Sequence, residues 1–241
     1  MKSVFVVGAS GATGKLLVAD LLAREFEVTV VVRSSSSLRG TFEGRSNYHE
    51  VTGSITEISD DELRPLLKGC DAVLSCLGHN LTFKGLFGKP RRLVADTVEK
   101  VCRVVEALTP DRKIKVILMN TTGNANRDIP ERPPLSQRIV VSILRVLLPP
   151  HVDNEQAADI LRTRIGRNHA LIEWAVVRPD GLTDETEVSA YTLHPSPIRN
   201  AIFDAGQTSR INVANFMANL AADPTLWDTW KGQMPVIYNK A

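Results

Sequence analysis

The sequence GASGATG occupies residues 8–14 and follows directly on the short apolar stretch KSVFVV at residues 2–7. A short β-branched run of this kind predicts a strand that is buried within a parallel sheet. Residues 15–24 carry leucines at helical spacing and predict a helix. The beginning of the chain therefore predicts a strand, a glycine-rich turn and a helix, which is how a parallel α/β sheet begins.

Each glycine of this turn has its own role if the turn encloses a phosphate group. Gly8 permits the sharp turn out of the strand, Gly11 lets the backbone approach a pyrophosphate, and Gly14 lets the helix pack closely on the sheet. Amides at the helix N-terminus then face the anion, and the hydroxyl groups of Ser10 and Thr13 can add donors. The agreement of strand, turn and helix favours a dinucleotide site over a turn without a ligand. The predicted contacts are Gly8, Ser10, Gly11, Ala12, Thr13 and Gly14.

The rest of the chain alternates between segments of strand character and segments of helix character. Strands are predicted at residues 26–32, 47–51, 71–76, 113–119 and 171–177, and helices at 60–68, 91–108 and 152–165. Because signals for tight hairpins come only late in the chain, the strands should be parallel. We therefore predict an α/β fold with one domain over residues 1–241, a Rossmann-type doubly wound parallel sheet with a small C-terminal region on the substrate side.

Composition and charge narrow the classes of protein. With 43% hydrophobic and 23% charged residues the 241-residue chain is an ordinary globular sequence, and a net charge of +2 is too small to indicate nucleic-acid binding. The N-terminal apolar run is too short for a signal peptide, and no run approaches the ~20 residues of a membrane span. Cys70, Cys76 and Cys102 show no paired spacing, and the histidines form no metal motif. These features predict a reducing, cytoplasmic protein without a metal.

The end of the second predicted strand indicates which dinucleotide is bound. An acidic residue there would bond to the ribose 2′-hydroxyl of NAD, but this sequence continues as VVVRSSSSLR. Arg33 stands where the acidic residue would be, and Ser34 and Arg39 follow it. A guanidinium can pair with a 2′-phosphate and stack on adenine, so the sequence favours NADP(H) over NAD(H). The alternative is a solvated basic loop.

Several segments form a combined pattern: GASGATG at 8–14, VVVR at 30–33, DAVLSCLG at 71–78, VILMNTTG at 116–123 and AVVRPDGLTD at 175–184. Together they resemble the atypical short-chain dehydrogenase/reductase superfamily. The sequence is most similar to its NAD(P)H-binding branch, which includes NmrA-like proteins and the biliverdin reductase B type of flavin reductase. The similarity covers most of the chain and weakens at 79–92 and 124–150.

The resemblance implies positions for the cofactor along the sheet edge. Cys76, Leu77 and Gly78 would border the ribose and the nicotinamide, and Ser54 would lie near the adenine. A physical argument agrees with this placement, because ligands of open parallel sheets bind beyond the carboxyl ends of the strands.

The resemblance also places residues beside the nicotinamide. Asn120 and Thr121 would lie there, where the flavin reductase has an active-site hydroxyl, so they are the candidate catalytic residues. Pro179, Gly181 and Leu182 would flank the same pocket. The alternative for Thr121 is that it only caps the end of the strand.

The proton-transfer pair of the superfamily is absent from this sequence. That pair is a Tyr with a Lys four residues later on one helix, where the Lys lowers the pKa of the phenol. None of Tyr48, Tyr191 and Tyr238 has such a lysine, and the helix predicted at 152–165 contains neither residue type. The sequence therefore argues against ordinary alcohol dehydrogenation by this pair and against sugar-nucleotide epimerisation.

Two functions remain. The first is an NADPH-dependent reductase of a flavin, a quinone or a similar flat acceptor, whose reduced form needs little help with protonation. The second is a non-catalytic dinucleotide sensor that changes partners with cofactor occupancy, as the NmrA-like resemblance implies. The fold alone does not choose between them.

The substrate side of the predicted site has its own candidates. His79 follows the fourth predicted strand and could reach the nicotinamide, and Phe83 and Phe87 could stack on a flat substrate. The alternatives are an exposed loop histidine and two aromatic loop anchors. Asp153 and Glu155 take the place of the missing pair, although carboxylates at a helix start are usually caps or dipole partners.

An inserted segment at 124–150 contains an amphipathic helix at 134–148. It could cap the domain, or contact a second subunit or a protein partner. It could also form an apolar lid over the substrate or touch a membrane surface, although it is too short to span one.

Overall fold

The computed structural model describes residues 2–33, 38–79, 88–131, 140–143, 145, 148–201 and 203–240. Its strands are β1 (Ser3–Val7), β2 (Glu27–Val32), β3 (Tyr48–Thr52), β4 (Ala72–Ser75), β5 (Ile114–Met119), β6 (Ile172–Pro179), β7 (Gly181–Thr183), β8 (Tyr191–His194), β9 (Gln207–Ser209) and β10 (Val236–Asn239). Its helices are α1 (Ala12–Ala23), α2 (Arg39–Phe42), α3 (Asp60–Leu67), α5 (Leu93–Leu108), α7 (Pro149–Asp159), α8 (Arg210–Ala222) and α9 (Pro224–Trp230), and a π-helix continues α7 over Ile160–Ile165.

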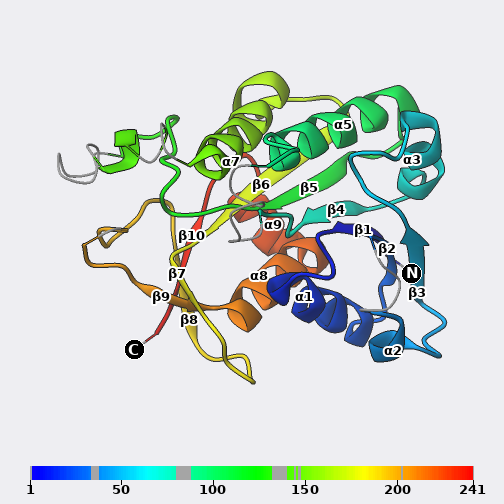
Figure 1. Ribbon diagram of the computed structural model, residues 1–241, viewed down its shortest axis with the longest axis horizontal. Coiled ribbons are helices and arrows are strands. Elements are labelled where there is room, and N and C mark those ends of the chain that lie inside the picture. Colours follow the sequence, from blue (N-terminus) through cyan, green and yellow to red (C-terminus); the bar gives the residue numbers. More distant parts are fainter. Residues whose placement is uncertain are drawn as a thin grey trace.

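The main sheet has the strand order β3-β2-β1-β4-β5-β6-β10-β8 (Figure 1). β1 pairs in parallel with β2 and with β4, so that Val6 lies between Val30 and Leu74. β8 runs antiparallel to β10 at one edge, and β7 and β9 form a small parallel sheet in the C-terminal region. This order is that of a doubly wound, Rossmann-like sheet, which confirms the predicted fold class.

The strand order reverses between β1 and β4, which creates the switch point of the fold. From β1 the chain proceeds to β2 and β3 on one side, and from β4 to β5 and β6 on the other. In such sheets the loops after the two central strands diverge and leave a crevice at the carboxyl edge. The loops after β1 and β4 are therefore the place to look for a ligand.

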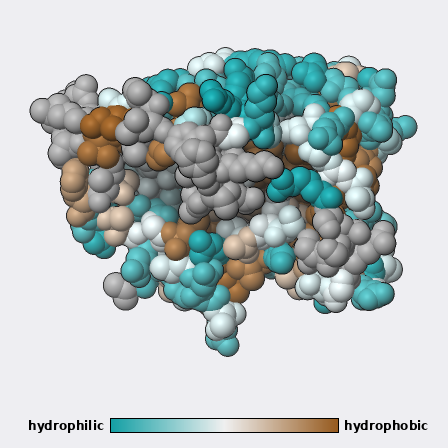
Figure 2. All heavy atoms as spheres, in the orientation of Figure 1, coloured by the Kyte–Doolittle hydropathy of each residue, from teal (hydrophilic) through white to brown (hydrophobic). Residues whose placement is uncertain are grey.

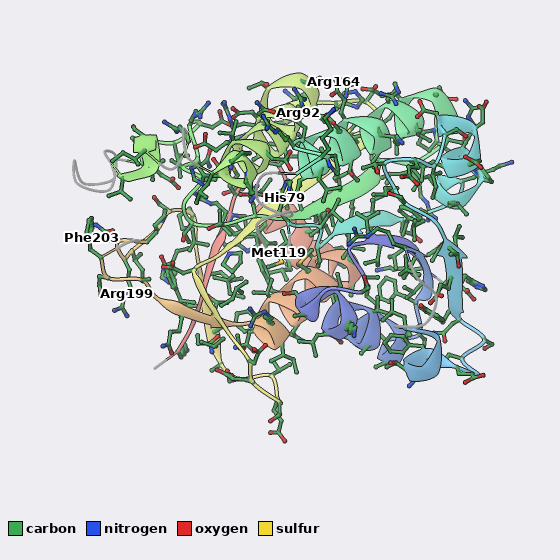
Figure 3. The ribbon with its side chains drawn as sticks, in the orientation of Figure 1. His79, Arg92, Met119, Arg164, Arg199 and Phe203 are labelled. Atoms are coloured by element: carbon green, nitrogen blue, oxygen red, sulfur yellow. The ribbon has the colours of Figure 1, made fainter. Side chains whose placement is uncertain are left out.

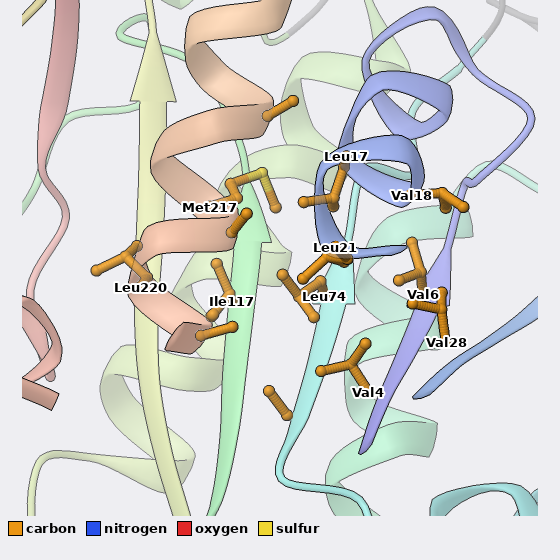
Figure 4. Close-up of a cluster of buried hydrophobic side chains, with 14 of the residues drawn as sticks. Val4, Val6, Leu17, Val18, Leu21, Val28, Leu74, Ile117, Met217 and Leu220 are labelled. Atoms are coloured by element: carbon orange, nitrogen blue, oxygen red, sulfur yellow. The ribbon is translucent and has the colours of Figure 1, made fainter. Parts of the chain in front are cut away.

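Helices cover both faces of the sheet. Val4 and Val6 of β1 point to the face covered by α1 and α8, where they pack with residues such as Leu17 and Met217 (Figure 4). Phe5 and Val7 alternate with them and belong to the other core, beneath α3, α5 and α7. Burial of β1 on both faces explains its continuous apolar sequence.

The structure moves some predicted boundaries. α1 begins at Ala12, three residues before the predicted helix, and Pro149 and Pro150 open α7, where proline is well tolerated. Of the predicted amphipathic helix 134–148, only 140–143, 145 and 148 lie within the described residues; 140–143 and 145 are helical, and 148 is not. Among the described residues, none of the helices has the length and apolarity of a membrane span.

Candidate functional site

The turn after β1 is held so tightly that two of its glycines leave no space for a side chain. Gly8 has φ +75°, and a Cβ built on it would lie 2.6 Å from the backbone of Cys76 and Leu77. A Cβ on Gly14 would lie 2.1 Å from the carbonyl oxygen of Gly8. The backbone of the turn, the start of α1 and the end of β4 therefore meet directly.

This arrangement leaves the N-terminus of α1 without a side-chain cap. Gly11 is the N-cap residue, and its amide donates to the carbonyl of Gly8 at 3.0 Å. Ser10, Gly11 and Ala12 are exposed, whereas Thr13 is buried. Backbone amides at an uncapped helix start bind anions, and the glycine cradle lets one approach closely. These residues fit the pyrophosphate of a dinucleotide.

The segment Cys76, Leu77 and Gly78 follows β4, and its start lies against the glycine turn. The amide of Cys76 donates to the carbonyl of Val7 at 3.0 Å. Burial raises the pKa of the Cys76 thiol to about 12, and its sulfur lies 3.8 Å from Met217 Sδ. Cys76 is therefore a neutral packing residue here and not a nucleophile.

On the far side of the turn, Arg33 follows β2 and is exposed. The next loop lies beside it, because the amide of Gly53 donates to the Val32 carbonyl at 2.8 Å. Ser54 belongs to this loop, and its hydroxyl contacts Thr56 at 2.8 Å. Ser34 and the side chain of Arg39 lie outside the described residues.

Lys100 holds the loop that carries Ser54, a role that the sequence did not suggest. Its ammonium group on α5 donates to the carbonyl of Ile55 at 3.0 Å and to that of Ile58 at 2.7 Å. An ammonium group is a good partner for several carbonyls at once, because it has three donors. No local sequence signal could reveal this contact, since it joins residues more than forty positions apart.

The end of β5 places Asn120 and Thr121 at the same edge of the sheet. Asn120 is buried, its Nδ2 donates to the Asn154 carbonyl at 2.8 Å, and its Oδ1 accepts from the Thr121 amide at 2.9 Å. Asn120 thus ties β5 to α7. The Thr121 hydroxyl oxygen accepts from the amide of Gly123 at 3.2 Å, within the turn that follows β5, and the hydroxyl group also carries a proton that it can donate.

The end of β6 lies beside this turn. The amide of Thr122 donates to the Pro179 carbonyl at 3.1 Å, and the Thr122 hydroxyl donates to Asp180 at 3.1 Å. Gly181 and Leu182 follow in β7, and Leu182 is exposed. The segments that were predicted around the nicotinamide therefore share one edge, because the carboxyl ends of parallel strands coincide.

Helix α7 faces these strand ends through a buried imidazole–carboxylate pair. His79 Nε2 lies 2.7 Å from Asp153 Oδ2, and the two side chains are 6% and 0% exposed. The Asp153 carboxylate also accepts the amides of Val94 and Ala95, at 2.8 and 2.9 Å. Asp153 on α7 thus caps the N-terminus of α5. Arg92 stands at the N-cap position of α5, but its side chain makes no capping hydrogen bond, so Asp153 supplies the cap instead.

A second cluster surrounds Glu155, which stands two residues after Asp153 on α7. Glu155 accepts a bidentate pair of bonds from Arg145, at 2.8 and 2.9 Å, and its Oε1 lies 3.4 Å from His151 Nε2. Burial acts to raise the pKa of the Glu155 carboxyl, but His151 and Arg145 outweigh it and lower the pKa to about 2. Glu155 is thus a permanently charged anchor and does not exchange protons near neutral pH.

The remaining candidates of the sequence lie outside the described residues. These are Phe83 and Phe87 and most of the segment 134–148. Within the described part of the chain, no cluster of three or more His, Cys, Asp or Glu side chains could hold a metal ion.

Comparison with known proteins places this geometry in context. The chain is 36% identical to HTATIP2 of Rattus norvegicus over 78 residues. These 78 residues make up 32% of this chain and 31% of the rat protein. It resembles the structure of a candidate NADH-flavin reductase from Streptococcus pneumoniae TIGR4, with 18% identity, TM-score 0.66 and full coverage of both chains. It also resembles a short-chain dehydrogenase/reductase of the wide type from Veillonella parvula DSM 2008 in complex with NADP, with 14% identity, TM-score 0.70 and coverage of 100% of this chain and 95% of the other.

At these identities the structural likeness supports the fold alone, and the HTATIP2 match spans under a third of that protein. A family model described as NAD(P)H-binding, however, matches residues 8–224 and includes the glycine turn, all strand ends of the site and α7. The chain therefore belongs to the NAD(P)H-binding family.

Proposed function

We propose that this protein is an NADPH-dependent reductase of a flat acceptor such as a flavin or a quinone. The observation that carries the proposal is the combination of an intact glycine cradle with a helix α7 that has no Tyr–Lys pair. Bound NADPH would supply a hydride. The contribution of the chain would be to bind the dinucleotide at Gly8–Gly14 and to orient the acceptor at the ends of β4, β5 and β6.

Thr121 is the proposed contact to the acceptor. It is half-buried at the end of β5, and its hydroxyl can donate while its oxygen accepts from Gly123. The Asn120 amide is already used between β5 and α7, so we assign it the positioning of Thr121. A flavin or quinone presents carbonyl oxygens to such a donor.

The proposed preference for NADP(H) depends on Arg33, which is exposed directly after β2. Arg33→Asp should weaken NADPH binding by roughly 10- to 100-fold, the scale of one charge-assisted contact and of the new repulsion. NADH is the matched control, since it lacks the 2′-phosphate, and its affinity should change little. Calorimetry with both dinucleotides measures the effect. Equal affinity of the unmodified protein for NADH and NADPH would contradict the assignment.

The test of the reductase itself is NADPH oxidation, followed at the nicotinamide absorbance, with a panel of flavins, quinones and dyes. We expect turnover of at least one of these acceptors. Thr121→Val should lower that turnover by roughly two- to tenfold, the value of one hydrogen bond, and should lower NADPH affinity by a smaller factor. Thr229→Val is the matched control, because the Thr229 hydroxyl bonds within α9, to the Thr225 carbonyl.

A sensor remains the second candidate, and the surface of the C-terminal region favours it. Ile198 and Phe203 of this region are each 63% exposed, and Ile143, between β5 and α7, is 50% exposed. Figure 2 shows brown, apolar atoms among teal ones on the left of this face, the side on which Figure 3 labels Phe203. Tight NADPH binding with no turnover of any acceptor would favour this second function and contradict the first.

A further inference from the structure

Lys100 reaches from α5 to the loop between β3 and α3, residues 53–58. We infer that Lys100 fixes the backbone of this loop so that the amides of Ile55 and Thr56 donate to the adenine base of the dinucleotide. Lys100 is then a positioning residue for the recognition of adenine. The inference rests on the proposed binding of NADP(H) beside Arg33, and it does not depend on which acceptor is reduced.

The loop lies where the adenosine half of the cofactor would be bound. The amide of Gly53 donates to the Val32 carbonyl at 2.8 Å, so the loop begins beside Arg33. Arg33 is the proposed contact to the 2′-phosphate, and the ribose that carries this phosphate also carries the adenine. A base attached to this ribose would lie next to the loop, in agreement with the place that the resemblance implies for Ser54.

Three carbonyl groups of the loop converge on Lys100. Its ammonium group donates to the carbonyls of Ile55, Thr56 and Ile58, at 3.0, 3.3 and 2.7 Å. These bonds use all three donors of the group. Ile55 is 7% exposed, and its side chain packs in the core beneath α3 and α5. The Ile55 side chain thus anchors the loop, and Lys100 determines how the peptide groups are turned.

The contact sets the direction of the amides on the loop. In a planar trans peptide the carbonyl and amide groups point in opposite directions. Because the Ile55 carbonyl points to Lys100, the Thr56 amide points away from it. The Ser54 carbonyl accepts from the amides of Glu57 and Ile58, at 2.8 and 2.9 Å, so the Ile55 amide points away from this turn.

These two amides are donors without a partner in the described part of the chain. None of its residues accepts a hydrogen bond from the amide of Ile55 or of Thr56. The hydroxyl groups nearby, those of Ser54 and Thr56, bond to each other at 2.8 Å. The loop therefore presents a short edge of oriented backbone donors, and an aromatic base with ring nitrogens is a suitable acceptor for it.

Backbone donors of fixed direction distinguish adenine from hypoxanthine, a base of the same shape. N1 of adenine is an acceptor and the neighbouring amino group is a donor. In hypoxanthine N1 carries a hydrogen and a carbonyl oxygen replaces the amino group. An amide that faces N1 therefore bonds to adenine, whereas two donors would oppose each other with hypoxanthine, and such a mismatch is costly in a site built for hydrogen bonding.

The link between the helices α5 and α3, which lie side by side in Figure 1, is made by another residue. Arg103, about one turn after Lys100 on α5, binds Asp60 in the first turn of α3 at 2.7 and 2.8 Å. The two helices are thus joined without Lys100, whose bonds go to the loop. Loss of Lys100 should therefore alter the loop and leave the helices in place.

The test is Lys100→Met, with the binding of NADPH and of its hypoxanthine analogue measured by calorimetry. Methionine has an unbranched apolar side chain without a donor. The wild type should bind NADPH at least about tenfold more tightly than the analogue, and the variant should reduce this ratio to less than about threefold. Its affinity for NADPH should fall by about tenfold, the value of one to two hydrogen bonds.

Two variants serve as controls. Lys115 also donates to carbonyl groups, those of Leu220 and Ala221 at 3.1 and 3.4 Å, but it joins β5 to the end of α8. Lys115→Met should therefore keep both wild-type affinities. Arg33→Asp should weaken both dinucleotides by the same factor, because both carry the 2′-phosphate, and should keep the ratio.

Lys100→Arg provides a milder variant that keeps the charge. A planar guanidinium does not replace an ammonium group that binds three carbonyls around one point, so the ratio should fall between those of wild type and Lys100→Met. Thermal unfolding of the free proteins shows which variants are folded. If Lys100→Met does not fold, the lower ratio of Lys100→Arg carries the test.

The outcomes separate the inference from the proposed reductase. A wild-type ratio in folded Lys100→Met and Lys100→Arg overturns the inference. A lower ratio in Lys115→Met as well overturns it in favour of a general effect of stability. Equal affinity of the wild type for NADPH and the hypoxanthine analogue also overturns it. These are measurements of binding, so they are independent of the acceptor screen that tests the reductase.

Discussion

Gly14→Ala should lower the affinity for NADPH by on the order of 100-fold or more, because it displaces the start of α1 from the turn. A Cβ at this position would lie 2.1 Å from the Gly8 carbonyl oxygen and 2.9 Å from Ala9 Cα. Both are backbone atoms, so no flexible side chain can move aside. The amides of the helix start would then no longer converge on the pyrophosphate, and several charge-assisted hydrogen bonds would be lost together.

Two further alanine variants separate the causes. Gly11→Ala meets only the Gly8 oxygen at 3.2 Å, so it should fold normally and lose affinity because the methyl group obstructs the pyrophosphate. Gly40→Ala is the control, since its Cβ would meet nothing within 4 Å. NADPH binding by fluorescence and thermal unfolding of the free proteins measure the series. Wild-type affinity in a folded Gly14→Ala variant would refute the assignment of the site.

The first half of the fold could be predicted because its signals are local. A buried β-branched strand, a glycine turn and an amphipathic helix each have a short-range pattern, and the repetition of these units implies a parallel sheet. The start of α3 is another such case, because Ser59 and Glu62 form a capping box within four residues. The glycine turn of the candidate site belongs to this class.

The individual helices and strands of the C-terminal region were not predicted, because its sequence lacks these periodic signals. α8 is buried on most of its surface between α1 and the sheet, so its apolar residues do not form a single stripe. β10 is only four residues long and joins the sheet beside β6. A strand this short is recognised only from the strands that it pairs with, and those strands lie far away in the sequence.

Several features of the candidate site depend on long-range contacts that the sequence did not suggest. Asp153 stands in the first turns of α7, yet it caps α5, whose start is 58 and 59 residues away. Asn120 was a candidate catalytic residue, but its side chain joins β5 to α7. Residue type and spacing do not encode which distant backbone group a polar side chain will meet.

Arg178 is the clearest residue of this kind. It belongs to the segment 175–184, which contributes to the resemblance, and no role was predicted for it; in the structure it is fully buried. Its guanidinium donates to Glu131 at 2.6 and 3.0 Å and to the carbonyl oxygens of Met234, Asn124 and Pro195. These bonds use all five donors of the group. One side chain of β6 thus joins the loop after β5 to two C-terminal segments.

Breaking this network should destabilise the protein strongly. Arg178→Met removes the guanidinium but leaves the Glu131 carboxylate, which is 4% exposed, without its counter-ion, and such a loss costs about 3–5 kcal/mol. Arg103→Met is the matched control, because Arg103 makes a bidentate pair with Asp60 at 2.7 and 2.8 Å on the surface, where a pair contributes less than about 1 kcal/mol. Urea unfolding of both variants measures the difference.

The double variant Arg178→Met with Glu131→Gln gives the last comparison. It removes the isolated buried charge, so it should be more stable than Arg178→Met alone, although the carbonyl oxygens of Met234, Asn124 and Pro195 still lack their donor. Partial recovery would show that an unpaired charge and unbonded carbonyl groups both contribute to the loss. If Arg178→Met were no less stable than Arg103→Met, the buried pair would not be what holds the loop after β5 in place.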